Sequence, residues 1–412
     1  MNIWLIKDSE LVPNDSGKPR LARMGLIAEI LLESGHQVTW WNTTFLHFKK
    51  EYRYHSDKSV LIKNNYRINF IHSCGYSKNV SLRRLLHNWI AAVKFYNMAK
   101  KTKALPDVIV VALPTISFVS KAIKYGRKRN IPVIVDVRDL NPDVFVDAFT
   151  GFKRSIVRVG IIPLQITLQR AMKKASAIFA TTQPYLDFGL KYAKRKRKEE
   201  DSVYYVSYPD KDKTQYKEKV EYWINRLGCN GNLVVCFFGQ FGNMSDIDTI
   251  IKAAKIIDEN LYNVLFVLCG EGEKYKQYQE AVSKIKNVVM TGWVDEDDIQ
   301  AIGQIADIGL MAYKDSKNYE LQMSNKFCEY LSLGLAVFLQ PMGIMQNVIK
   351  QNKCGLPYRS EKELVENIKY VLEQPNELTI MKRNARNLYE KNFCAESVYK
   401  AYADHIAEIG RD

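Results

Sequence analysis

The stretch MSNKFCEYLSLGLAV, residues 323–337, predicts a turn, a short helix, a glycine stop and a buried strand. Lys326 and Glu329 are three residues apart, which places them on one face of the helix near its start. Ser324 or Asn325 can cap that start, and a helix N-terminus beside a lysine favours an anion. A diphosphate at the helix tip, with a diol on the carboxylate, would describe a nucleotide sugar. The alternative is an ordinary surface Lys–Glu pair, which the spacing alone favours.

Length and composition bound the class of protein. At 412 residues, the chain is long enough for two domains. The seven cysteines form no CxxC pair, which favours reduced thiols over a disulfide framework or a zinc site. The six histidines show no metal-ligand spacing, so we expect no metal. The net charge of +15 indicates an anionic partner.

Strand and helix patterns alternate along the whole chain. Buried strand-like runs followed by helical stripes predict an α/β protein with a parallel sheet in each half. A polar, charged stretch around residues 210–219 suggests a linker. We therefore expect an N-terminal Rossmann-like domain over 1–212 and a C-terminal one over 213–394. A final helix over 395–412 is expected to pack back towards the first domain.

Glycine-bearing loops follow several predicted strands of the second half. Gly239, Gln240, Gly242 and Asn243 lie between a strand and a helix, where glycine lets the backbone approach a phosphate. The segment from Gly270 to Glu273 ends the next strand and could contact a nucleoside. Plain tight turns explain both loops equally well.

The first half offers two further candidate loops. Arg138 and Asp139 end a predicted strand and suit the wall of a ligand site, although an Arg–Asp pair that pins the loop is the alternative. Gly17 and Lys18 lie in the first strand-to-helix loop and could meet a donor phosphate. A capped helix start with proline near its first position explains the same residues.

Two segments of the first half combine cations with apolar residues. They span residues 82–101 and 152–174 and predict basic amphipathic helices. Such helices suit an anionic membrane surface, whereas the alternative is a solvated face over a core face. We expect a cytoplasmic protein that is peripheral on the inner face of the cytoplasmic membrane and binds no nucleic acid.

Together these pieces resemble a GT-B-fold glycosyltransferase of the large retaining family 4, over nearly the whole chain. The motif RDLNPD, residues 138–143, is similar to an element of bacterial polysaccharide members that act on lipid-linked sugars. The resemblance extends to transferases of the N-acetyl-fucosaminyl type in surface-polysaccharide assembly. Its other motifs are residues 17–20, 35–39, 239–248, 270–272, 292–294 and 324–337.

The resemblance implies two Rossmann-like domains with parallel sheets that face each other across a cleft. The domain over 1–212 would bind the acceptor, and the domain over 213–394 would bind the nucleotide sugar. It also implies roles for individual residues. Glu329 would hold the ribose, Lys326 the diphosphate, and the backbone near Trp293 and Val294 the base. Asp139, Arg138 and Lys326 would form the catalytic set. The donor-binding set would be Gly17, Lys18, Gly239, Gln240, Gly242, Asn243, Gly270, Glu271, Trp293, Val294, Ser324, Asn325, Lys326 and Glu329.

The chain departs from the family pattern at several positions. Gln240 and Ser245 stand where many relatives carry an arginine and a lysine for the phosphates, which leaves more to Lys326. The first glutamate of the family's glutamate pair is missing, because Leu321 occupies its position. Met323 replaces the usual proline.

The sequence thus predicts a metal-independent, retaining glycosyltransferase with no cofactor beyond a nucleotide-sugar co-substrate, UDP-linked by expectation. The expected acceptor is a lipid-linked saccharide or another polysaccharide precursor. Two alternatives remain open at this point. One is a nucleotide-sugar 2-epimerase of the same fold, and the other is a non-catalytic binder of an anionic polymer.

Overall fold

The computed structural model describes residues 1–16, 19–147, 149–229, 231–314, 316–340 and 343–411. Contacts divide the chain into two compact units. The first unit comprises Met1–Tyr205 and Ala395–Asp412, and the second Val206–Cys394. The stretch that suggested a linker contains a 3-10 helix and the beginning of a helix, both within the second unit.

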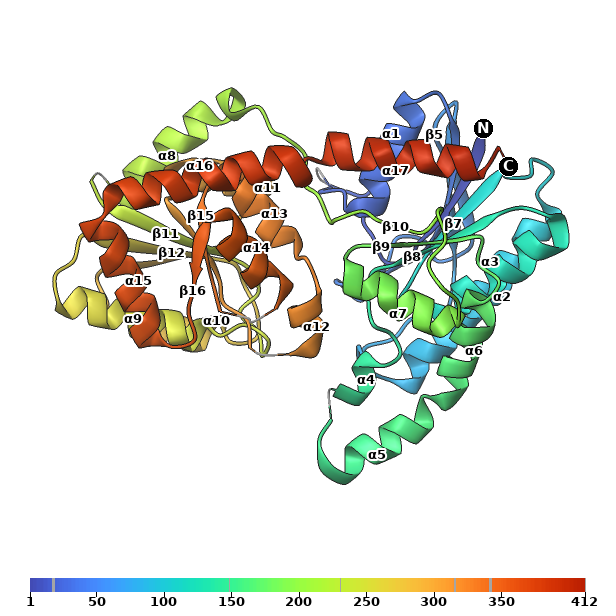
Figure 1. The fold of residues 1–412 in the computed structure, drawn as a ribbon, viewed down its shortest axis with the longest axis horizontal. Coiled ribbons are helices and arrows are strands. Elements are labelled where there is room, and N and C mark those ends of the chain that lie inside the picture. Colours follow the sequence, from blue (N-terminus) through green and yellow to red (C-terminus); the bar gives the residue numbers. More distant parts are fainter. Residues whose placement is uncertain (17–18, 148, 230, 315, 341–342, 412) are drawn as a thin grey trace. The chain divides into compact units, whose positions relative to one another are not determined.

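The first unit is built on an eight-stranded sheet (Figure 1). The strand order is β10-β9-β8-β7-β1-β2-β6-β5, and every neighbouring pair is parallel except β5 and β6. The strands are β1 (Asn2–Ile6), β2 (Gln37–Thr43), β5 (Lys58–Lys63), β6 (Tyr66–Ile71), β7 (Val108–Ala112), β8 (Val133–Val137), β9 (Ala177–Ala180) and β10 (Ser202–Val203), with a small antiparallel pair of β3 (Phe45–Leu46) and β4 (Glu51–Tyr52).

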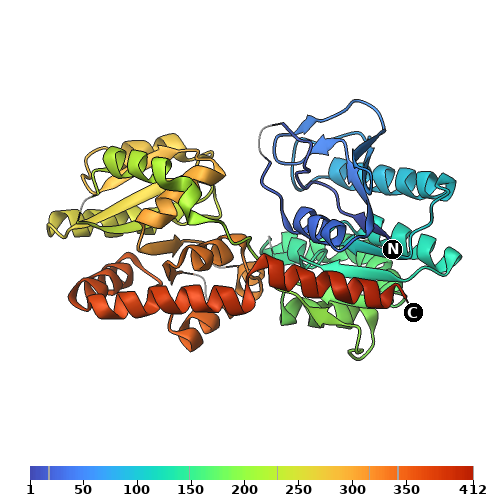
Figure 2. The same cartoon turned by 90° about the horizontal axis from the view of Figure 1, so that it is seen from above.

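Helices cover both faces of this sheet, because its strands are apolar on both sides. The helices are α1 (Arg23–Glu33), α2 (Leu82–Lys101), α3 (Ile116–Arg129), α4 (Val144–Asp147), α5 (Gly151–Gly160), α6 (Ile162–Met172), α7 (Gln183–Ala193) and α17 (Ala395–Ile409). Figures 1 and 2 show α17, the last helix of the chain, lying beside α1. On the opposite face, the ring of Trp4 stacks on Tyr125 of α3 with 5.4 Å between ring centroids.

The second unit contains a six-stranded sheet of order β13-β12-β11-β14-β15-β16, parallel throughout. The strands are β11 (Leu233–Phe238), β12 (Val264–Cys269), β13 (Val288–Gly292), β14 (Ile308–Met311), β15 (Ala336–Leu339) and β16 (Gly355–Pro357). The helices are η1 (Lys213–Tyr216), α8 (Lys217–Leu227), α9 (Ile247–Glu259), α10 (Tyr275–Val282), α11 (Glu296–Ile305), α12 (Lys317–Leu321), α13 (Asn325–Leu333), α14 (Ile344–Asn352), α15 (Glu361–Glu373) and α16 (Pro375–Asn392).

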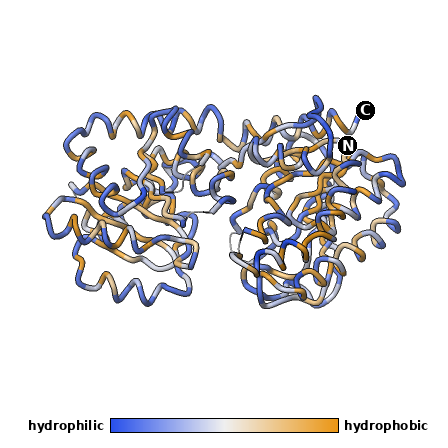
Figure 3. The backbone as a smooth tube through the Cα atoms, turned by 60° about the horizontal axis from the view of Figure 1, so that its bottom comes forward, coloured by the Kyte–Doolittle hydropathy of each residue, from blue (hydrophilic) through white to orange (hydrophobic). Residues whose placement is uncertain are grey.

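Two hydrophobic layers sandwich the second sheet. One packs α8, α11, α13 and α14 against one face of the strands, and the other packs α9, α10 and α15 against the opposite face. Figure 3 shows the hydrophobic colouring concentrated in the interior of each unit. The parallel α/β architecture expected from the sequence is confirmed in both halves. The antiparallel edge strand β5 and the β3–β4 pair are additions that the sequence patterns did not predict.

In the part of the chain that the structure describes, no helix is both long enough and apolar enough to cross a bilayer. The seven cysteines are free thiols.

A buried ionic network joins distant segments of the first unit. Asp136, fully buried at the end of β8, accepts from Arg23 Nε at 3.2 Å and from Arg138 Nε at 2.7 Å. Arg138 also donates to Glu10 Oε1 at 2.7 Å, and Glu10 Oε2 accepts from the Met24 backbone N–H at the start of α1. Two cations and two carboxylates therefore balance one another.

The same network reaches the C-terminal helix. The Arg23 guanidinium lies over the rings of Tyr399 and Tyr402 of α17, at 5.4 and 5.1 Å from their centroids. It also donates to the carbonyl oxygens of Tyr204 and Tyr205. Burial opposes ionisation of Asp136, but the adjacent Arg138 and Arg23 outweigh it and lower the pKa of its carboxyl group.

We expect Asp136→Asn to lower the free energy of unfolding of the first unit by about 3 kcal/mol at pH 7, because two buried guanidinium groups lose their shared carboxylate. The pKa of Asp136 is lowered by folding, so its contribution is present above the ordinary pKa of 3.8 and is lost as the pH falls through the folded value. The difference between variant and native protein should therefore shrink in acid. Urea denaturation at pH 7 and pH 3 measures it.

Asp57→Asn is the matched control, since Asp57 pairs with Lys94 at a site where both side chains are about one-third exposed. Its cost should stay below about 1 kcal/mol. Equal losses for the two variants would contradict the role of the buried network.

Candidate functional site

The carboxyl edge of the second sheet has the geometry of a nucleotide site. Counted from β11, the strand order is 3-2-1-4-5-6, so the order reverses between β11 and β14. Ligands of open α/β sheets bind beyond the carboxyl ends of strands at such a reversal. The loops that follow β11 and β14, and the N-terminus of α13, bring the candidate residues to this point.

Two glycine loops at this edge are locked together through their backbones. The Gly239 N–H donates to the Cys269 carbonyl at 2.9 Å, and the Phe241 N–H donates to the Glu271 carbonyl at 2.9 Å. The loop after β11 therefore continues the parallel pairing of β11 with β12 beyond the strands themselves. Its backbone position is fixed without any ligand contact.

The individual glycines of these loops have different reasons to be glycine. A Cβ at Gly270, where φ is +145°, would lie 1.7 Å from the Gly239 carbonyl oxygen. A Cβ at Gly272, where φ is +155°, would lie 2.6 Å from the Phe241 carbonyl oxygen. The tight-turn interpretation thus accounts for both. Gly242 has no heavy atom within 4 Å of its Cβ position, so the space beside it is open to a ligand.

Lys326 of α13 extends to the backbone of the first loop. A Cβ at Gly239 would lie 2.6 Å from Lys326 Nζ. The ammonium nitrogen lies 4.1 Å from the ring centroid of Phe237 and 4.8 Å from that of Tyr313. Burial lowers the pKa of Lys326 to about 7, although the nearby Glu329 acts in the opposite direction. A desolvated cation of this kind is stabilised by any anion placed beside it.

Helix α13 presents its N-terminus and Glu329 at the same edge. Ser324 caps the helix, its hydroxyl oxygen accepting from the Phe327 N–H at 3.2 Å. Glu329 is 3% exposed. The Tyr330 hydroxyl accepts from the Phe238 N–H at 3.0 Å and donates to the Leu310 carbonyl at 3.1 Å, which fixes α13 across β11 and β14. The backbone of α13, which carries Lys326 and Glu329, is therefore fixed on the sheet.

The remaining donor candidates line the rim of this edge. Gln240, Asn243, Glu271 and Asn325 are exposed. Trp293 is 70% exposed, and Val294 is half-buried. Trp293 follows Gly292, whose carbonyl accepts from the Gly270 N–H at 2.8 Å, so it belongs to the same group of loops.

The first-unit candidates divide differently. Gly17 and Lys18 lie outside the described residues. Arg138 is engaged with Asp136 and Glu10, as the loop-pinning interpretation requires, but with carboxylates other than that of Asp139. In the described part of the chain, Asp139 Oδ1 is buried and has no hydrogen-bond partner, and burial raises the pKa of this carboxyl group.

A polar pair at the corresponding point of the first sheet was not predicted from the sequence. The strand order of this sheet reverses between β1 and β7. There, the Thr115 hydroxyl donates to Asp8 Oδ1 at 2.8 Å, and both residues are buried. An acidic residue two positions after the end of a strand was the available signal. Phe237 and Tyr313, which surround Lys326, were also missed, because their meeting depends on β11 and β14 being neighbours.

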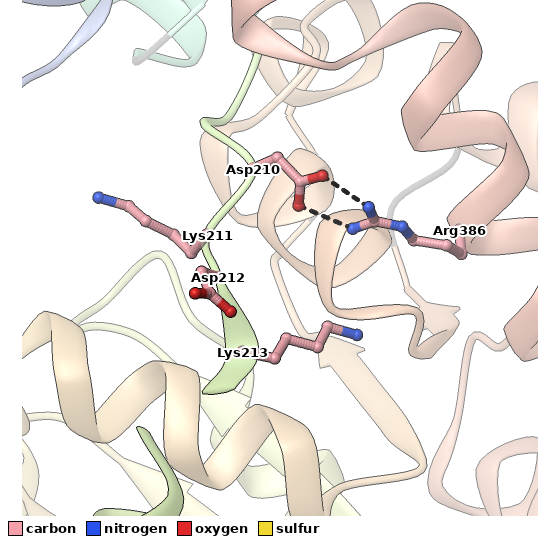
Figure 4. Close-up of a pocket in the computed structure, with 5 residues that line it drawn as sticks. All are labelled: Asp210, Lys211, Asp212, Lys213 and Arg386. Carbon is pink, nitrogen blue, oxygen red and sulfur yellow. Dashed lines mark hydrogen bonds and ion pairs between the residues drawn. The ribbon is translucent and has the colours of Figure 1, made fainter. Parts of the chain in front are cut away.

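A hollow of about 510 Å³ lies elsewhere in the second unit (Figure 4). Lys213 and Arg386 donate to the carbonyls of Leu333 and Ser332, which places the hollow at the C-terminal end of α13, away from Lys326. Arg386 binds the Asp210 carboxylate with both terminal nitrogens, at 3.0 and 2.7 Å, so its charge is already balanced. The lining residues are Asp210, Lys211, Asp212, Lys213 and Arg386.

Among the described side chains, no group of three or more histidines, cysteines, aspartates or glutamates could hold a metal ion.

Comparison with known proteins shows which family part of the chain matches. Residues 220–388 match the family "Glycosyl transferases group 1". This segment contains the two glycine loops, α13, Lys326 and Glu329.

Curated relatives match over part of the chain. The chitobiosyldiphosphodolichol beta-mannosyltransferase of Candida glabrata is 23% identical over 169 residues, which are 38% of this chain and 36% of the relative. The UDP-glycosyltransferase TURAN of Arabidopsis thaliana is 26% identical over 122 residues, which are 28% of this chain and 26% of the relative. The matches thus span about a third or less of these relatives.

Solved structures match over the whole chain. HepE from Anabaena, in complex with UDP, has a TM-score of 0.67 at 15% identity and covers 99% of this chain and 100% of its own. Sucrose-phosphate synthase from Thermosynechococcus elongatus has a TM-score of 0.72 at 12% identity, covering 99% and 98%. The fold is GT-B. The fold expected from the sequence resemblance is confirmed.

We expect Gly270→Ala to lower the free energy of unfolding of the second unit by more than about 2 kcal/mol, because its methyl group would collide with the Gly239 carbonyl at a strained φ. Gly242→Ala is the matched control from the partner loop and should leave stability within about 0.5 kcal/mol. Thermal denaturation of both variants distinguishes them. Equal stability of the two would show that the loops are not interlocked as described.

Proposed function

We propose that the protein is a retaining glycosyltransferase that moves a sugar from a UDP-sugar to a lipid-linked saccharide or another polysaccharide precursor. The observation that carries the proposal is the position of Lys326 Nζ beside the Gly239 backbone, at the point where the second sheet reverses its strand order. The UDP bound to HepE and the match of residues 220–388 to a glycosyltransferase family support the same assignment.

The donor would bind on the second unit. Its diphosphate would take the space beside Gly239 and Gly242, with Lys326 and the backbone N–H groups at the start of α13 as partners. Glu329 would accept hydrogen bonds from the ribose hydroxyls, and the base would lie against Trp293 and Val294. These contacts use Gln240 and Asn243 at the rim of the first loop, and Gly270 and Glu271 at the second.

The transfer step depends on charge that develops as the glycosidic bond to the diphosphate breaks. The leaving oxygen gains negative charge, which the Lys326 ammonium and the fixed N–H dipoles of α13 and the glycine loop would stabilise. No metal is needed for this role, so we propose metal-independent transfer. Asp139, with a raised pKa and a buried oxygen, would bind the acceptor or the donor sugar on the first unit, and Arg138 would hold the loop that carries it.

The acceptor assignment has independent support. The Candida glabrata relative is named for transfer of mannose to a saccharide on a diphosphate lipid. The sequence resemblance to bacterial transferases of the N-acetyl-fucosaminyl type leads to the same class of acceptor. We propose that the protein works at the inner face of the cytoplasmic membrane, with basic helices of the first unit against anionic lipid.

The function is tested by incubating UDP-, GDP- and dTDP-sugars with a diphosphate-lipid saccharide and following product formation. We expect thermal stabilisation by a UDP-sugar and transfer to the lipid, with the anomeric configuration of the donor retained in the product by NMR. Glu329→Ala should weaken UDP binding by about tenfold or more and abolish transfer while the fold survives. Glu373→Ala, an exposed carboxylate of α15, is the control for Glu329.

Other outcomes of this experiment have defined meanings. Release of a free epimer without acceptor would replace transfer by nucleotide-sugar epimerisation. Salt-dependent binding of an anionic polymer with no affinity for any sugar nucleotide would replace it by polymer binding. Unchanged UDP affinity of Glu329→Ala in calorimetry would remove the ribose role.

We also expect UDP affinity to depend on pH through Lys326. Its pKa is lowered to about 7, so the neutral amine becomes populated above neutral pH, and diphosphate binding must then take up a proton. Affinity should fall by up to about tenfold per pH unit above pH 7. Lys326→Ala should bind weakly and lose this dependence, whereas Lys255→Ala, an exposed lysine of α9, should keep it. Calorimetry in buffers of different ionisation enthalpy measures the proton uptake, and a flat native profile would contradict the role.

A further inference from the structure

Helix α2 of the first unit carries an apolar stripe that faces solvent. Leu82 is 84% exposed, Leu86 50% and Trp89 56%, and Leu85 between them is 40% exposed. These positions follow the i, i+3, i+4, i+7 spacing of one helical face. The opposite face supplies the buried residues of α2, including Phe95. The helix therefore has two apolar faces, and only one of them packs against the rest of the first unit.

The stripe continues onto two neighbouring loops. Phe48 is 80% exposed and Val80 61%. The loops that carry them are fastened to each other, because Lys50 Nζ donates to Asn79 Oδ1 at 2.5 Å. Val80 directly precedes the N-terminal cap of α2. Exposed large apolar side chains are thus carried by three adjoining segments.

Cations lie on the same segments as these apolar side chains. Lys50 and Arg84 lie over the ring of Tyr76, at 4.8 and 5.6 Å from its centroid. Arg84 donates to the Asn79 carbonyl, and Arg83 to the carbonyls of the segment before α2. These hydrogen bonds go to neutral oxygens, so they position the charges without neutralising them. Burial and the repulsion of Arg84 lower the pKa of Lys50, as expected for cations gathered close together.

Helix α5 carries a second exposed apolar stripe beside cations. Phe152 is 81% exposed, Ile156 57% and Val159 66%, again on one face at i, i+4 and i+7, and α5 buries none of its residues. Lys153 and Arg158 are also exposed, beside this stripe. Helix α2 follows β6, and α5 follows β8 and the short helix α4, so both belong to connections that start at the carboxyl edge of the sheet.

We propose that the stripe of α2 with Phe48 and Val80, together with the stripe of α5, is a membrane-docking surface that inserts into an anionic phospholipid bilayer. The apolar side chains would enter the acyl boundary, and Lys50 and Arg84 would bind lipid phosphates. An apolar stripe flanked by cations is the composition of helices that lie in a membrane interface. The net charge of +15 adds long-range attraction. The inference rests on the proposed function, because it places the enzyme where its lipid-linked acceptor resides.

The test is sedimentation of the full chain with phosphatidylglycerol vesicles and with phosphatidylcholine vesicles. We expect salt-sensitive binding to the anionic vesicles. Leu82→Ser/Leu86→Ser and Phe152→Ser/Ile156→Ser should each weaken that binding by about tenfold or more, because two exposed apolar side chains are lost from the inserted face. Leu61→Ser is the matched control, since Leu61 is 54% exposed on β5 of the same unit. Its binding should be unchanged.

Two further measurements distinguish membrane docking from donor binding and from self-association. Affinity for UDP and transfer to a water-soluble acceptor should be unchanged in both double variants. If native protein binds vesicles but fails to bind UDP, the proposed function is wrong and the docking surface still holds. Binding of native protein to neither kind of vesicle, or binding that the stripe variants retain, would overturn the docking surface. A dimer in solution that Leu82→Ser/Leu86→Ser dissociates would overturn it too and assign the stripe to a second copy of the chain. Weaker binding with a smaller salt dependence in Lys50→Ala would support the phosphate contact, and unchanged binding of this variant would count against it.

Discussion

The desolvation of Lys326 is the constraint on which the second unit is organised. Its ammonium group lies over Phe237 and Tyr313 and close to the Gly239 backbone, where water is displaced by rings and peptide groups. Contacts of a cation with aromatic faces return about 0.5–2 kcal/mol, which is less than the cost of removing a charge from water. The lowered pKa expresses the remainder. An anion bound beside Lys326 would recover that energy, which is the physical reason for proposing that the diphosphate binds there.

In the first unit, by contrast, the buried charges are paired with one another. Arg23, Arg138, Asp136 and Glu10 neutralise one another completely, and their network ties the end of β8 to α1 and α17. Breaking such a network is costly, so its members are suited to scaffolding. Arg138 therefore holds the following loop in place, and Asp139, one residue further, is left with an oxygen that no described group satisfies. Under the proposed function, Arg138 would position the loop and the adjacent Asp139 would contact the substrate.

Much of this could be predicted from sequence, for identifiable reasons. Alternating strand and helix periods indicated the two parallel sheets, and the order of motifs placed Gly239, Lys326 and Glu329 in one domain. The interlocking of Gly270 with Gly239 could not be predicted, because it depends on the backbone path of two loops. Tyr313 and Phe237 were hidden because nothing in the sequence shows that β14 lies beside β11. The edge strand β5 was not predicted, because a largely exposed strand has little apolar pattern to indicate it.

Both units contain a largely parallel sheet in which the strand order reverses, and they differ in the charged group that lies at this reversal. In the second unit, that point holds a desolvated cation, Lys326. In the first, it holds the carboxylate of Asp8, bound by the Thr115 hydroxyl, and the pKa of Asp8 is lowered by Lys7 and this hydrogen bond despite burial. A cation stabilises a leaving diphosphate, whereas a carboxylate accepts hydrogen bonds that sugar hydroxyls donate. Under the proposed function, this contrast in charge favours the second unit for the donor diphosphate and the first for the hydroxyl-bearing acceptor.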